Sequence, residues 1–426
     1  MKLNYKRTIL VGFAFFLISA FWQAYDTIVP LILTNKFHME QGESGFIMSL
    51  DNIFAIVMLP LFGTLSDKTR SRFGRRTPYI VCGTVAVALI FPILGIVPSL
   101  WGFVLILLLC LFGMATFRSP AVALMPDVTP KPLRSKGNAV INLLGTAGCI
   151  LVLALGAIFK TDAKGKTDFT PYIIAVAALM LTALVVFLLT VKEPQWAREN
   201  EALEASAPKE EEKTPEAQQP ARRLSRAELR SLLFLLASVA LWFIAYNAIT
   251  SKYSVYATEV LEVPYTLTLM VAQGAAIASY IPVGMVASRF GRKRTILVGV
   301  LLLTTAFGLA ALITKDTPPF LMYILFSVAG IGWATINVNS FPMVVELASQ
   351  SNVGRYTGFY YTASMAAQVV TPIASGFIVQ YLGWEAFFPY STVFAALAFL
   401  TMCFVRHGDS KPKAAGSVLE SFDVDD

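Results

Sequence analysis

The sequence is poor in charge and in the residues that build most catalytic and metal sites. Only 14% of its 426 residues are charged and only two are histidines, whereas 56% are apolar and the mean hydropathy is +0.64. A soluble chain carries about 25% charged residues, so this composition argues against a soluble globular protein. The sequence also has no Walker A phosphate-binding loop and no nucleophile–histidine–acid arrangement. We therefore expect neither an enzyme nor an ATP-driven pump, and no cofactor or metal site.

Cysteine and glycosylation signals are equally sparse. The four cysteines lie in apolar runs and lack metal-ligand spacing, which is typical of small packing residues. No Asn-x-Ser/Thr acceptor site occurs, which fits a bacterial inner membrane protein. The formal net charge of +7 does not indicate nucleic-acid binding, because the basic residues sit in short loops between apolar segments.

Long apolar runs recur along the whole chain. A bilayer needs about 20 apolar residues per helix, and twelve segments satisfy this. Their expected limits are 8–34, 42–66, 77–97, 101–126, 136–160, 171–191, 229–257, 266–287, 294–313, 319–347, 355–380 and 384–405. A β-barrel would instead show alternating segments of about ten residues. The expected fold class is an all-α polytopic membrane protein with 12 transmembrane helices, embedded in a lipid bilayer.

Lysine and arginine in the loops predict the orientation. With the N-terminus inside, five of the 34 basic residues lie outside: Lys36, Lys160, Lys164, Lys166 and Lys315. Two more, Arg118 and Lys252, lie within spans, so the other 27 are cytoplasmic. Both termini are therefore expected on the cytoplasmic side of the inner membrane.

A polar stretch divides the spans six and six. Residues 192–228 are rich in Glu, Lys, Ala and Pro and show no apolar stripe, which predicts a mobile cytoplasmic linker. The expected organisation is a six-helix half over 1–191, this linker, a second six-helix half over 229–406 and a polar tail over 407–426.

The two halves repeat short motifs at a nearly constant distance. The sequence at 24–28 (AYDTI) matches that at 245–249 (AYNAI) with an offset of 221 residues. Phe73-Gly-Arg-Arg matches Phe290-Gly-Arg-Lys with an offset of 217, which indicates a four-residue insertion in the first copy. Matches in chain order at similar spacing predict two pseudo-symmetric copies of one six-helix unit.

The loop after the second span carries a glycine- and arginine-rich motif, GTLSDKTRSRFGRR, over residues 63–76. Asp67 is placed where it could face the N-terminus of the next helix. The arginines could reach Asp127 at the end of span 4, and those of the second copy could reach Glu346. Such contacts would close the cytoplasmic side in one state and break in another. The predicted gating residues are Gly63, Asp67, Arg72, Arg75, Arg76, Asp127, Arg292, Glu346 and Arg355.

These motifs resemble those of the major facilitator superfamily over the whole chain. The loop insertion resembles the glycoside–pentoside–hexuronide:cation symporters, and Pro120-x-x-Ala-Leu-x-x-Asp127 resembles the span-4 signature of the sucrose–proton symporters. The resemblance implies the major facilitator fold, with spans 1, 4, 7 and 10 lining a central cavity. It also implies a monomeric carrier that imports a sugar, a disaccharide or glycoside, with a proton by alternating access.

Departures from these families limit what is carried over. Melibiose-type sodium symporters have two acids in span 2 where this chain has Ala55 and Leu59, and an Asp where it has Arg118. A sodium–melibiose site is therefore not expected. Sucrose symporters place an Arg where this chain has Val122, one turn from Arg118 on the same helix face.

Four charged residues stand out because they lie well inside the spans: Asp26, Asp51, Arg118 and Lys252. A charge at mid-membrane costs at least about 2.5–3.5 kcal/mol, so such residues usually face a cavity and have partners. Asp26 and Lys252 lie at similar depth, and an ion pair between them is the first hypothesis. A carboxyl group removed from water binds a proton more readily, so Asp26 or Asp51 could carry the coupled proton.

Polar and aromatic residues in the spans could bind sugar hydroxyls and sugar ring faces. The predicted substrate-binding residues are Trp22, Gln23, Tyr25, Asp26, Asn52, Arg118, Asn142, Tyr246, Asn247, Lys252, Trp333, Asn337 and Gln368. An alternative stays open: a carrier or exporter for a charged or lipid-like organic substrate, with Arg118 and Lys252 as anion ligands.

Overall fold

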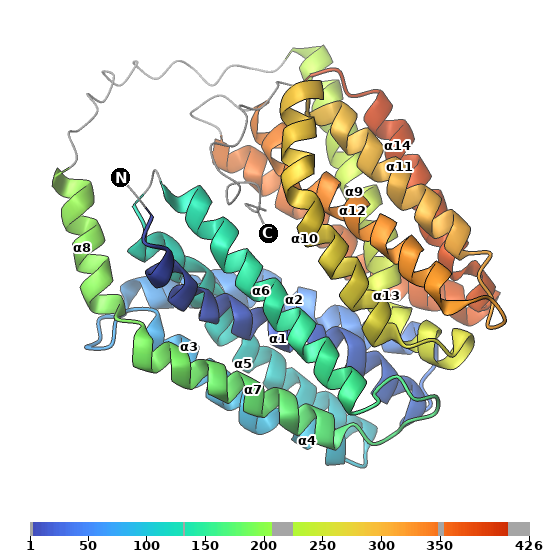
Figure 1. Ribbon diagram of the computed structural model, residues 1–426, viewed down its shortest axis with the longest axis horizontal. Helices are drawn as coiled ribbons and strands as arrows, with labels where there is room; N and C mark the ends of the chain where they lie inside the picture. Colours follow the sequence, from blue (N-terminus) through green and yellow to red (C-terminus); the bar gives the residue numbers. More distant parts are fainter. Residues whose placement is uncertain (1–2, 131–132, 207–224, 348–352, 408–426) are drawn as a thin grey trace. The chain divides into compact units, whose positions relative to one another are not determined.

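The computed structural model describes residues 3–130, 133–206, 225–347 and 353–407, and the regular structure in these ranges is helical (Figure 1). The spans of the N-terminal half are α1 (Tyr5–Asn35), α2 (Gln41–Lys68), α3 (Thr77–Ile90) with the short α4 (Ile93–Ile96), α5 (Leu100–Val128), α6 (Arg134–Ile158) and α7 (Thr170–Thr190). Those of the C-terminal half are α9 (Arg226–Val255) with a π-helical turn (Tyr256–Leu261), α10 (Tyr265–Phe290), α11 (Arg292–Ala310), α12 (Pro319–Val345), α13 (Val353–Leu382) and α14 (Phe387–Cys403), the last preceded by a 3₁₀ turn (Trp384–Ala386).

Eleven of the described helices are long and apolar enough to cross a membrane. The twelfth expected span is α10, in which the side chains of Ile281 and Ser288 lie outside the described part. Helices satisfy their own backbone hydrogen bonds, which hydrocarbon cannot do for them. The prediction of an all-α membrane protein with twelve spans in two halves is confirmed.

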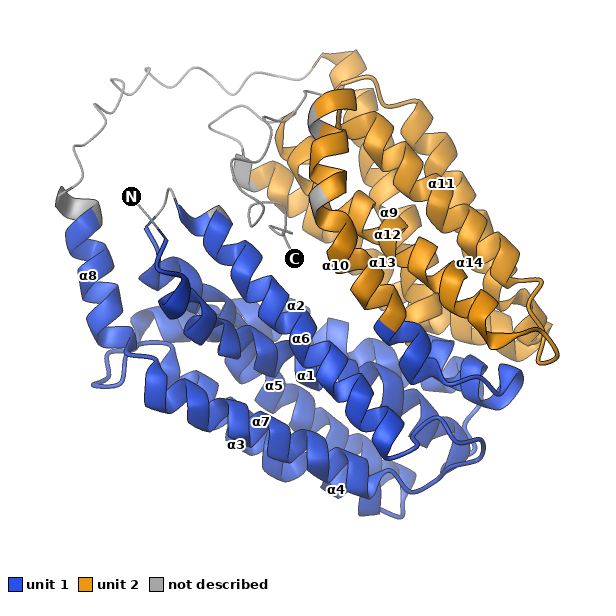
Figure 2. Cartoon of the chain, in the orientation of Figure 1, with its two compact units in different colours: residues 1–206, 252–270 blue, residues 207–251, 271–426 orange. Residues whose placement is uncertain are grey.

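The chain forms two compact units (Figure 2). Unit 1 contains residues 1–206 together with 252–270, and unit 2 contains the remainder. Helix α9 therefore begins in unit 2 and ends in unit 1, together with the first turns of α10. The segment 252–270 is called the α9–α10 corner below. The boundaries at 191, 228 and 406 stay a prediction.

A close helix contact recurs in each unit between the corresponding spans. In unit 1, a Cβ on Gly83 of α3 would lie 2.8 Å from the carbonyl oxygen of Gly113 on α5. In unit 2, a Cβ on Gly299 of α11 would lie 2.9 Å from the carbonyl oxygen of Gly332 on α12. Only glycine permits such close backbone approach, so the internal repeat extends from sequence motifs to packing.

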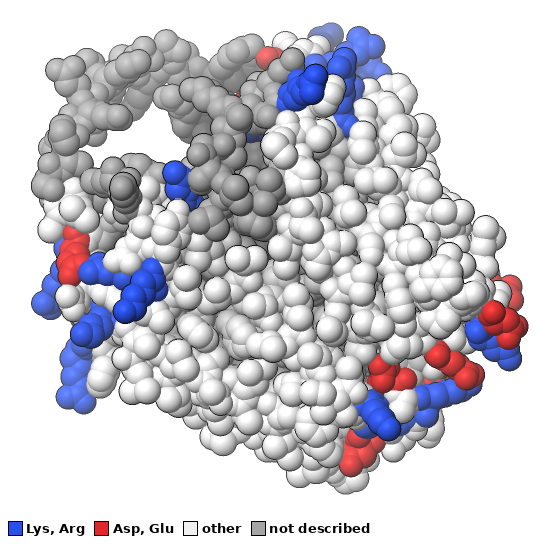
Figure 3. Space-filling model, in the orientation of Figure 1, with Lys and Arg blue, Asp and Glu red and all other residues white. Residues whose placement is uncertain are grey.

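Charged side chains gather at the helix ends. On the face shown in Figure 3, the middle of each unit carries neither Lys, Arg, Asp nor Glu on its surface, and these residues lie near the ends of the helices. An uncharged belt bounded by charged ends is what a bilayer requires of a membrane protein.

The stretch predicted as a linker contains a helix. Residues Glu193–Ser206 form α8, which packs against α5 in unit 1. The expectation of a mobile linker is wrong for these residues, because Glu193, Trp196 and Asn200 are buried against other parts of unit 1. Residues 207–224, and the predicted tail beyond His407, lie outside the described residues.

Candidate functional site

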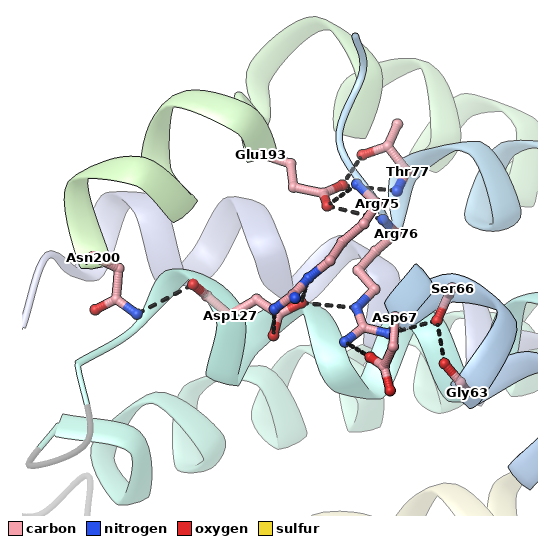
Figure 4. A network of polar contacts seen from close by, with 9 residues as sticks. All are labelled: Gly63, Ser66, Asp67, Arg75, Arg76, Thr77, Asp127, Glu193 and Asn200. Atoms are coloured by element: carbon pink, nitrogen blue, oxygen red, sulfur yellow. Dashed lines mark hydrogen bonds and ion pairs between the residues drawn. The ribbon is translucent and has the colours of Figure 1, made fainter. Parts of the chain in front are cut away.

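The loop between α2 and α3 joins its arginines to the end of α5 (Figure 4). Arg75 Nε donates to Asp127 Oδ2 over 2.9 Å, and Arg76 Nε donates to the same oxygen over 2.7 Å. The hydrogen bond to Asp127 raises the pKa of Arg75. The contact of these arginines with Asp127 is confirmed, and their role in gating stays a prediction.

Arg76 also ties the loop to the last turn of α2. Its Nη1 donates to Ser66 Oγ over 2.5 Å, and its Nη2 lies 2.5 Å from Asp67 Oδ1. The expectation that Asp67 faces the N-terminus of α3 is wrong. The Arg76 side chain turns back from the start of α3 toward α2, and Asp67 pairs with it there.

Glu193 of α8 takes the position at the N-terminus of α3. The backbone N–H groups of Arg75 and Arg76 donate to its Oε1 over 2.7 and 2.8 Å. The N–H and hydroxyl of Thr77 donate to its Oε2 over 2.7 and 2.6 Å. The first N–H groups of a helix have no partner within it and attract an anion. A carboxylate that is only 2% exposed thus holds three of them.

Gly74 makes this approach possible. Its φ is +108°, which residues with a side chain rarely adopt. A Cβ at this position would overlap the carboxyl group of Glu193. Glycine is therefore required both by the backbone conformation and by the space that Glu193 fills.

Two further contacts hold α8 against unit 1. The Arg7 guanidinium lies 5.2 Å from the centre of the buried Trp196 ring and pairs with Glu199, and its hydrogen bond lowers the pKa of Glu199. Asn200 Nδ2 donates to the backbone carbonyl of Asp127 over 3.1 Å. The predictions from sequence did not include this docking. Its available signal was the spacing of Trp196, Asn200 and Leu203, which share one helix face.

The second copy of the motif forms the corresponding ion pair in unit 2. Arg292 Nη1 donates to Glu346 Oε2 over 2.8 Å, which confirms the predicted contact. In unit 1, Gly63 lies against α5, where a Cβ would come within 2.8 Å of Ser119 Oγ.

Two predicted gating arginines take other positions. The Arg72 guanidinium lies 4.7 Å from the centre of the Phe73 ring, and that of Arg355 lies 5.4 Å from the centre of the Phe359 ring. Both side chains are exposed, and neither enters an ion pair within the described residues.

Within unit 1, α1, α2 and α5 pack on one another and bring three predicted charges together. Asp26 of α1 interacts electrostatically with Asp51 of α2 and with Arg118 of α5. Asp51 Oδ1 accepts hydrogen bonds from the backbone N–H and the side-chain amide of Asn52, over 2.6 and 2.8 Å. All four residues are half-buried. We call Asp26, Asp51, Asn52 and Arg118 the acid cluster.

Two aromatic residues of α1 border the acid cluster. The Arg118 guanidinium lies 5.3 Å from the centre of the Trp22 ring. The Trp22 and Tyr25 rings meet edge to face with centres 5.3 Å apart. Tyr25 is fully buried, and Asp51 and Asp26 are its acidic electrostatic neighbours.

Lys252 does not pair with Asp26 in this structure. Its side chain is fully buried, and its Nζ donates to the backbone oxygen of Gln41 over 2.8 Å and to Gln41 Oε1 over 3.2 Å. Gln41 begins α2, whereas Asp26 lies nine residues, about 13 Å, before the end of α1. The lysine side chain extends toward the helix ends, so the predicted ion pair is wrong for this structure.

Polar contacts anchor the whole α9–α10 corner within unit 1. Besides Lys252, the contacts are Asn35 Nδ2 to Glu259 Oε1 (2.8 Å), Lys164 Nζ to Glu262 Oε1 (2.7 Å), Thr266 Oγ1 to Asp162 Oδ2 (2.7 Å), and Thr161 with Tyr265 through their hydroxyls (2.6 Å). The corner includes a π-helical turn, and Glu262 follows it with a left-handed φ of 57°. Such turns are frequent at functional positions in helices.

The remaining predicted binding residues are distributed over several helices. In unit 2, the Tyr246 ring of α9 and the Trp333 ring of α12 stack with centres 3.7 Å apart and an angle of 2°. Asn247 and Gln368 donate to backbone carbonyls of their own helices. Asn337 of α12, and Gln23 and Asn142 of unit 1, are half-buried.

Among the described residues, no group of three or more His, Cys, Asp or Glu side chains could hold a metal ion. The site consists of hydrogen-bonding, charged and aromatic groups, which can bind and release a solute. Apolar spans that bring charged and aromatic side chains together within the membrane are typical of a membrane transporter.

The family model of the Major Facilitator Superfamily matches residues 11–281 and, in a second match, residues 266–421. The chain belongs to this superfamily and is a transporter rather than an enzyme.

Three curated relatives match parts of the chain. An uncharacterized symporter of Synechocystis, sll1374, is 26% identical over 176 residues, which are 38% of this chain and 32% of the relative. The chloramphenicol resistance protein CraA of Acinetobacter baumannii is 26% identical over 180 residues, 40% of this chain and 42% of the relative. The sucrose transport protein SUC3 of Arabidopsis thaliana is 29% identical over 137 residues, 27% of this chain and 23% of the relative. The matched part of the chain thus spans less than half the length of each relative.

Solved structures match over nearly the whole chain. The nucleoside transporter NupG has a TM-score of 0.65 and 16% identity, with 95% of this chain and all of that chain covered. The xylose transporter XylE from E. coli, in an inward open conformation, has a TM-score of 0.67 and 14% identity, with 98% and 99% covered. At this identity the likeness shows the major facilitator fold.

Proposed function

We propose that this transporter is a proton-coupled symporter that imports a neutral sugar, a disaccharide or glycoside, across the cytoplasmic membrane. The observation that carries the proposal is the acid cluster, in which two carboxyl groups and one guanidinium interact electrostatically on three packed helices of unit 1. The partial similarity to a symporter and to a sucrose transport protein supports it.

The two acids are suited to carrying the coupled proton. Carboxyl groups in a partly desolvated site can be neutralised by a proton from the outer solution. Arg118 is near both, so a bound proton changes the charge balance around it. Both proton and sugar would be released inward after the two halves rock about the site.

The charge pattern supports an orientation with cytoplasmic termini. The arginine network, α8 and the start of α1 are joined by contacts such as Arg7 with Glu199. This places the basic loop between α2 and α3 at the same helix ends as the N-terminus, as the positive-inside rule requires. The network would keep the cytoplasmic end of unit 1 together in one state and loosen in another.

A labelled disaccharide panel in proteoliposomes tests the proposal. We expect concentrative uptake with an inward proton gradient and its loss when the gradient is collapsed. Asp26→Asn and Asp51→Asn should each abolish accumulation while leaving the protein folded. Full accumulation by both variants would overturn the assignment of the proton to this cluster.

One observation favours a second candidate. The similarity to a chloramphenicol resistance protein covers as much of this chain as the similarity to the symporter. A charged or lipid-like substrate, carried in either direction, would use Arg118 and Lys252 as ligands. Two results together would establish this candidate instead. Vesicles that hold folded protein would take up no sugar, and they would transport an organic anion in a way that Arg118→Gln abolishes.

A further inference from the structure

Two buried hydrogen-bond donors beside the acid cluster have no partner among the described residues: the indole N–H of Trp22 and the hydroxyl of Tyr25. The Tyr25 side chain is fully buried, and the indole nitrogen is itself removed from solvent. Leaving such a group unpaired costs about 1–3 kcal/mol, so a ligand that supplies an acceptor recovers part of this free energy on binding.

Both donors belong to one surface of α1. Trp22 and Tyr25 are three residues apart and lie on the same helix face, with their rings in edge contact. Asp26 lies on the same face of α1, one residue after Tyr25, and both Asp26 and Asp51 of α2 interact electrostatically with Tyr25. The Arg118 guanidinium of α5 lies over the Trp22 ring. The unpaired donors thus border a group of charged side chains that can accept and donate hydrogen bonds.

The contacts of Trp22 limit how it can recognise a ligand. Arg118 lies against its ring, and Phe21 and Tyr25 meet it at steep angles with centres 5.4 and 5.3 Å away. Its ring is therefore already packed against protein groups, whereas its N–H is unused. Recognition of a sugar through this N–H fits the geometry better than stacking of the sugar on the ring.

We propose that the Trp22 N–H and the Tyr25 hydroxyl form a subsite for a sugar hydroxyl group, which accepts hydrogen bonds from them and donates a hydrogen bond to a carboxyl oxygen of the acid cluster. The inference rests on the proposed sugar transport and adds how the site would distinguish one sugar from another. A hydroxyl group both accepts and donates, whereas an ether oxygen or a fluorine cannot donate. The subsite would therefore select a free hydroxyl at one ring position and reject a substrate in which that position is substituted.

The matched variants are Trp22→Phe and Tyr25→Phe, which keep the rings and remove the donors. Binding of the transported sugar to purified protein, measured by calorimetry, should weaken about 2- to 10-fold in each variant, the range of a single net hydrogen bond. Trp242→Phe is the control, because Trp242 in unit 2 is fully buried and its N–H is also unpaired within the described chain. That control should bind the sugar like the parent protein.

Deoxy and deoxy-fluoro analogues identify the hydroxyl. The parent protein should discriminate against both analogues at one position, and Trp22→Phe or Tyr25→Phe should lose part of that discrimination at the same position only.

If the parent protein binds the sugar but both variants bind every analogue as it does, the subsite is refuted while sugar transport stands. If the parent protein binds no sugar, the proposed function fails first. A melting curve for each variant shows whether a loss of binding comes from misfolding, and Tyr25→Phe provides the test if Trp22→Phe does not fold.

Discussion

Replacing Glu193 by Gln tests whether α8 is held by an anion at the N-terminus of α3. The amide keeps one oxygen, which can accept from the N–H groups of Arg75 and Arg76 as Oε1 does now. The other position becomes an NH2 group that faces the N–H of Thr77, donor against donor, whereas the Thr77 hydroxyl can rotate and accept from the amide. The negative charge at the helix N-terminus is lost as well.

The magnitude follows from these losses. One buried N–H left unpaired costs about 1–3 kcal/mol, and the lost charge at a helix N-terminus adds up to about 2 kcal/mol. We expect about 3 kcal/mol for the docking of α8 on the loop between α2 and α3. Since 1.4 kcal/mol corresponds to a factor of ten, exchange of the α8 amide hydrogens should accelerate about 100-fold.

Hydrogen exchange read by mass spectrometry on the detergent-solubilised protein measures this directly. Glu199→Gln is the matched control, since it changes the same residue type on the same helix in a half-buried ion pair with Arg7. A partly exposed pair contributes little, and the contact of Arg7 with the Trp196 ring remains, so exchange of α8 in this variant should stay much closer to that of the parent protein than exchange in the Glu193 variant. Equal exchange of α8 in the Glu193 and Glu199 variants would refute the anion-cap reasoning.

Three further predictions concern other positions. Gly74→Ala should destabilise unit 1 by at least about 2 kcal/mol, because it forces a left-handed φ on alanine and displaces the neighbouring carboxylate; a melting temperature equal to that of the parent protein would contradict this. Lys252→Met should keep or raise the melting temperature while uptake falls, because an apolar chain replaces a buried amino group whose acceptors within the described residues are the neutral oxygens of Gln41. Lys164→Met is the exposed control, and a strong fall in the melting temperature of the Lys252 variant would show that its hydrogen bonds stabilise the fold. Hydrogen bonds from Thr170 lower the pKa of Asp168, so the carboxylate stabilises the fold above its unfolded pKa of about 3.9, and this effect is lost as the pH falls through the lower folded pKa. The stability difference between the parent protein and Asp168→Asn should therefore shrink in this acid range. A difference that does not depend on pH would exclude the effect.

The sequence predicts those parts of the molecule that depend on local composition or on repetition. Apolar runs define the spans, because only a helix satisfies its own backbone in hydrocarbon. The pairing of Arg75 and Arg76 with Asp127, and of Arg292 with Glu346, follows from acid and glycine spacings that occur twice in the chain.

Other contacts depend on side-chain direction or on distant partners. The similar depth of Asp26 and Lys252 along their helices predicted an ion pair between them. The long lysine side chain instead reaches toward the helix ends, where it donates to Gln41. Glu193 lies in a polar stretch whose composition resembles a linker, and its partners are backbone N–H groups, which leave no trace in residue identity. The meeting of Asp26, Asp51 and Arg118 required knowing that α1, α2 and α5 pack together.

The contact between Gly74 and Glu193 has a consequence for how this chain can change over evolution. A side chain at position 74 would occupy the space of the carboxylate, so it becomes acceptable only after position 193 has shortened or moved. Conversely, once the acid is lost, the requirement for glycine is reduced to that of the backbone conformation. The two positions therefore form an epistatic pair across more than a hundred residues. In relatives that share this loop, substitutions at the two sites should be inherited together.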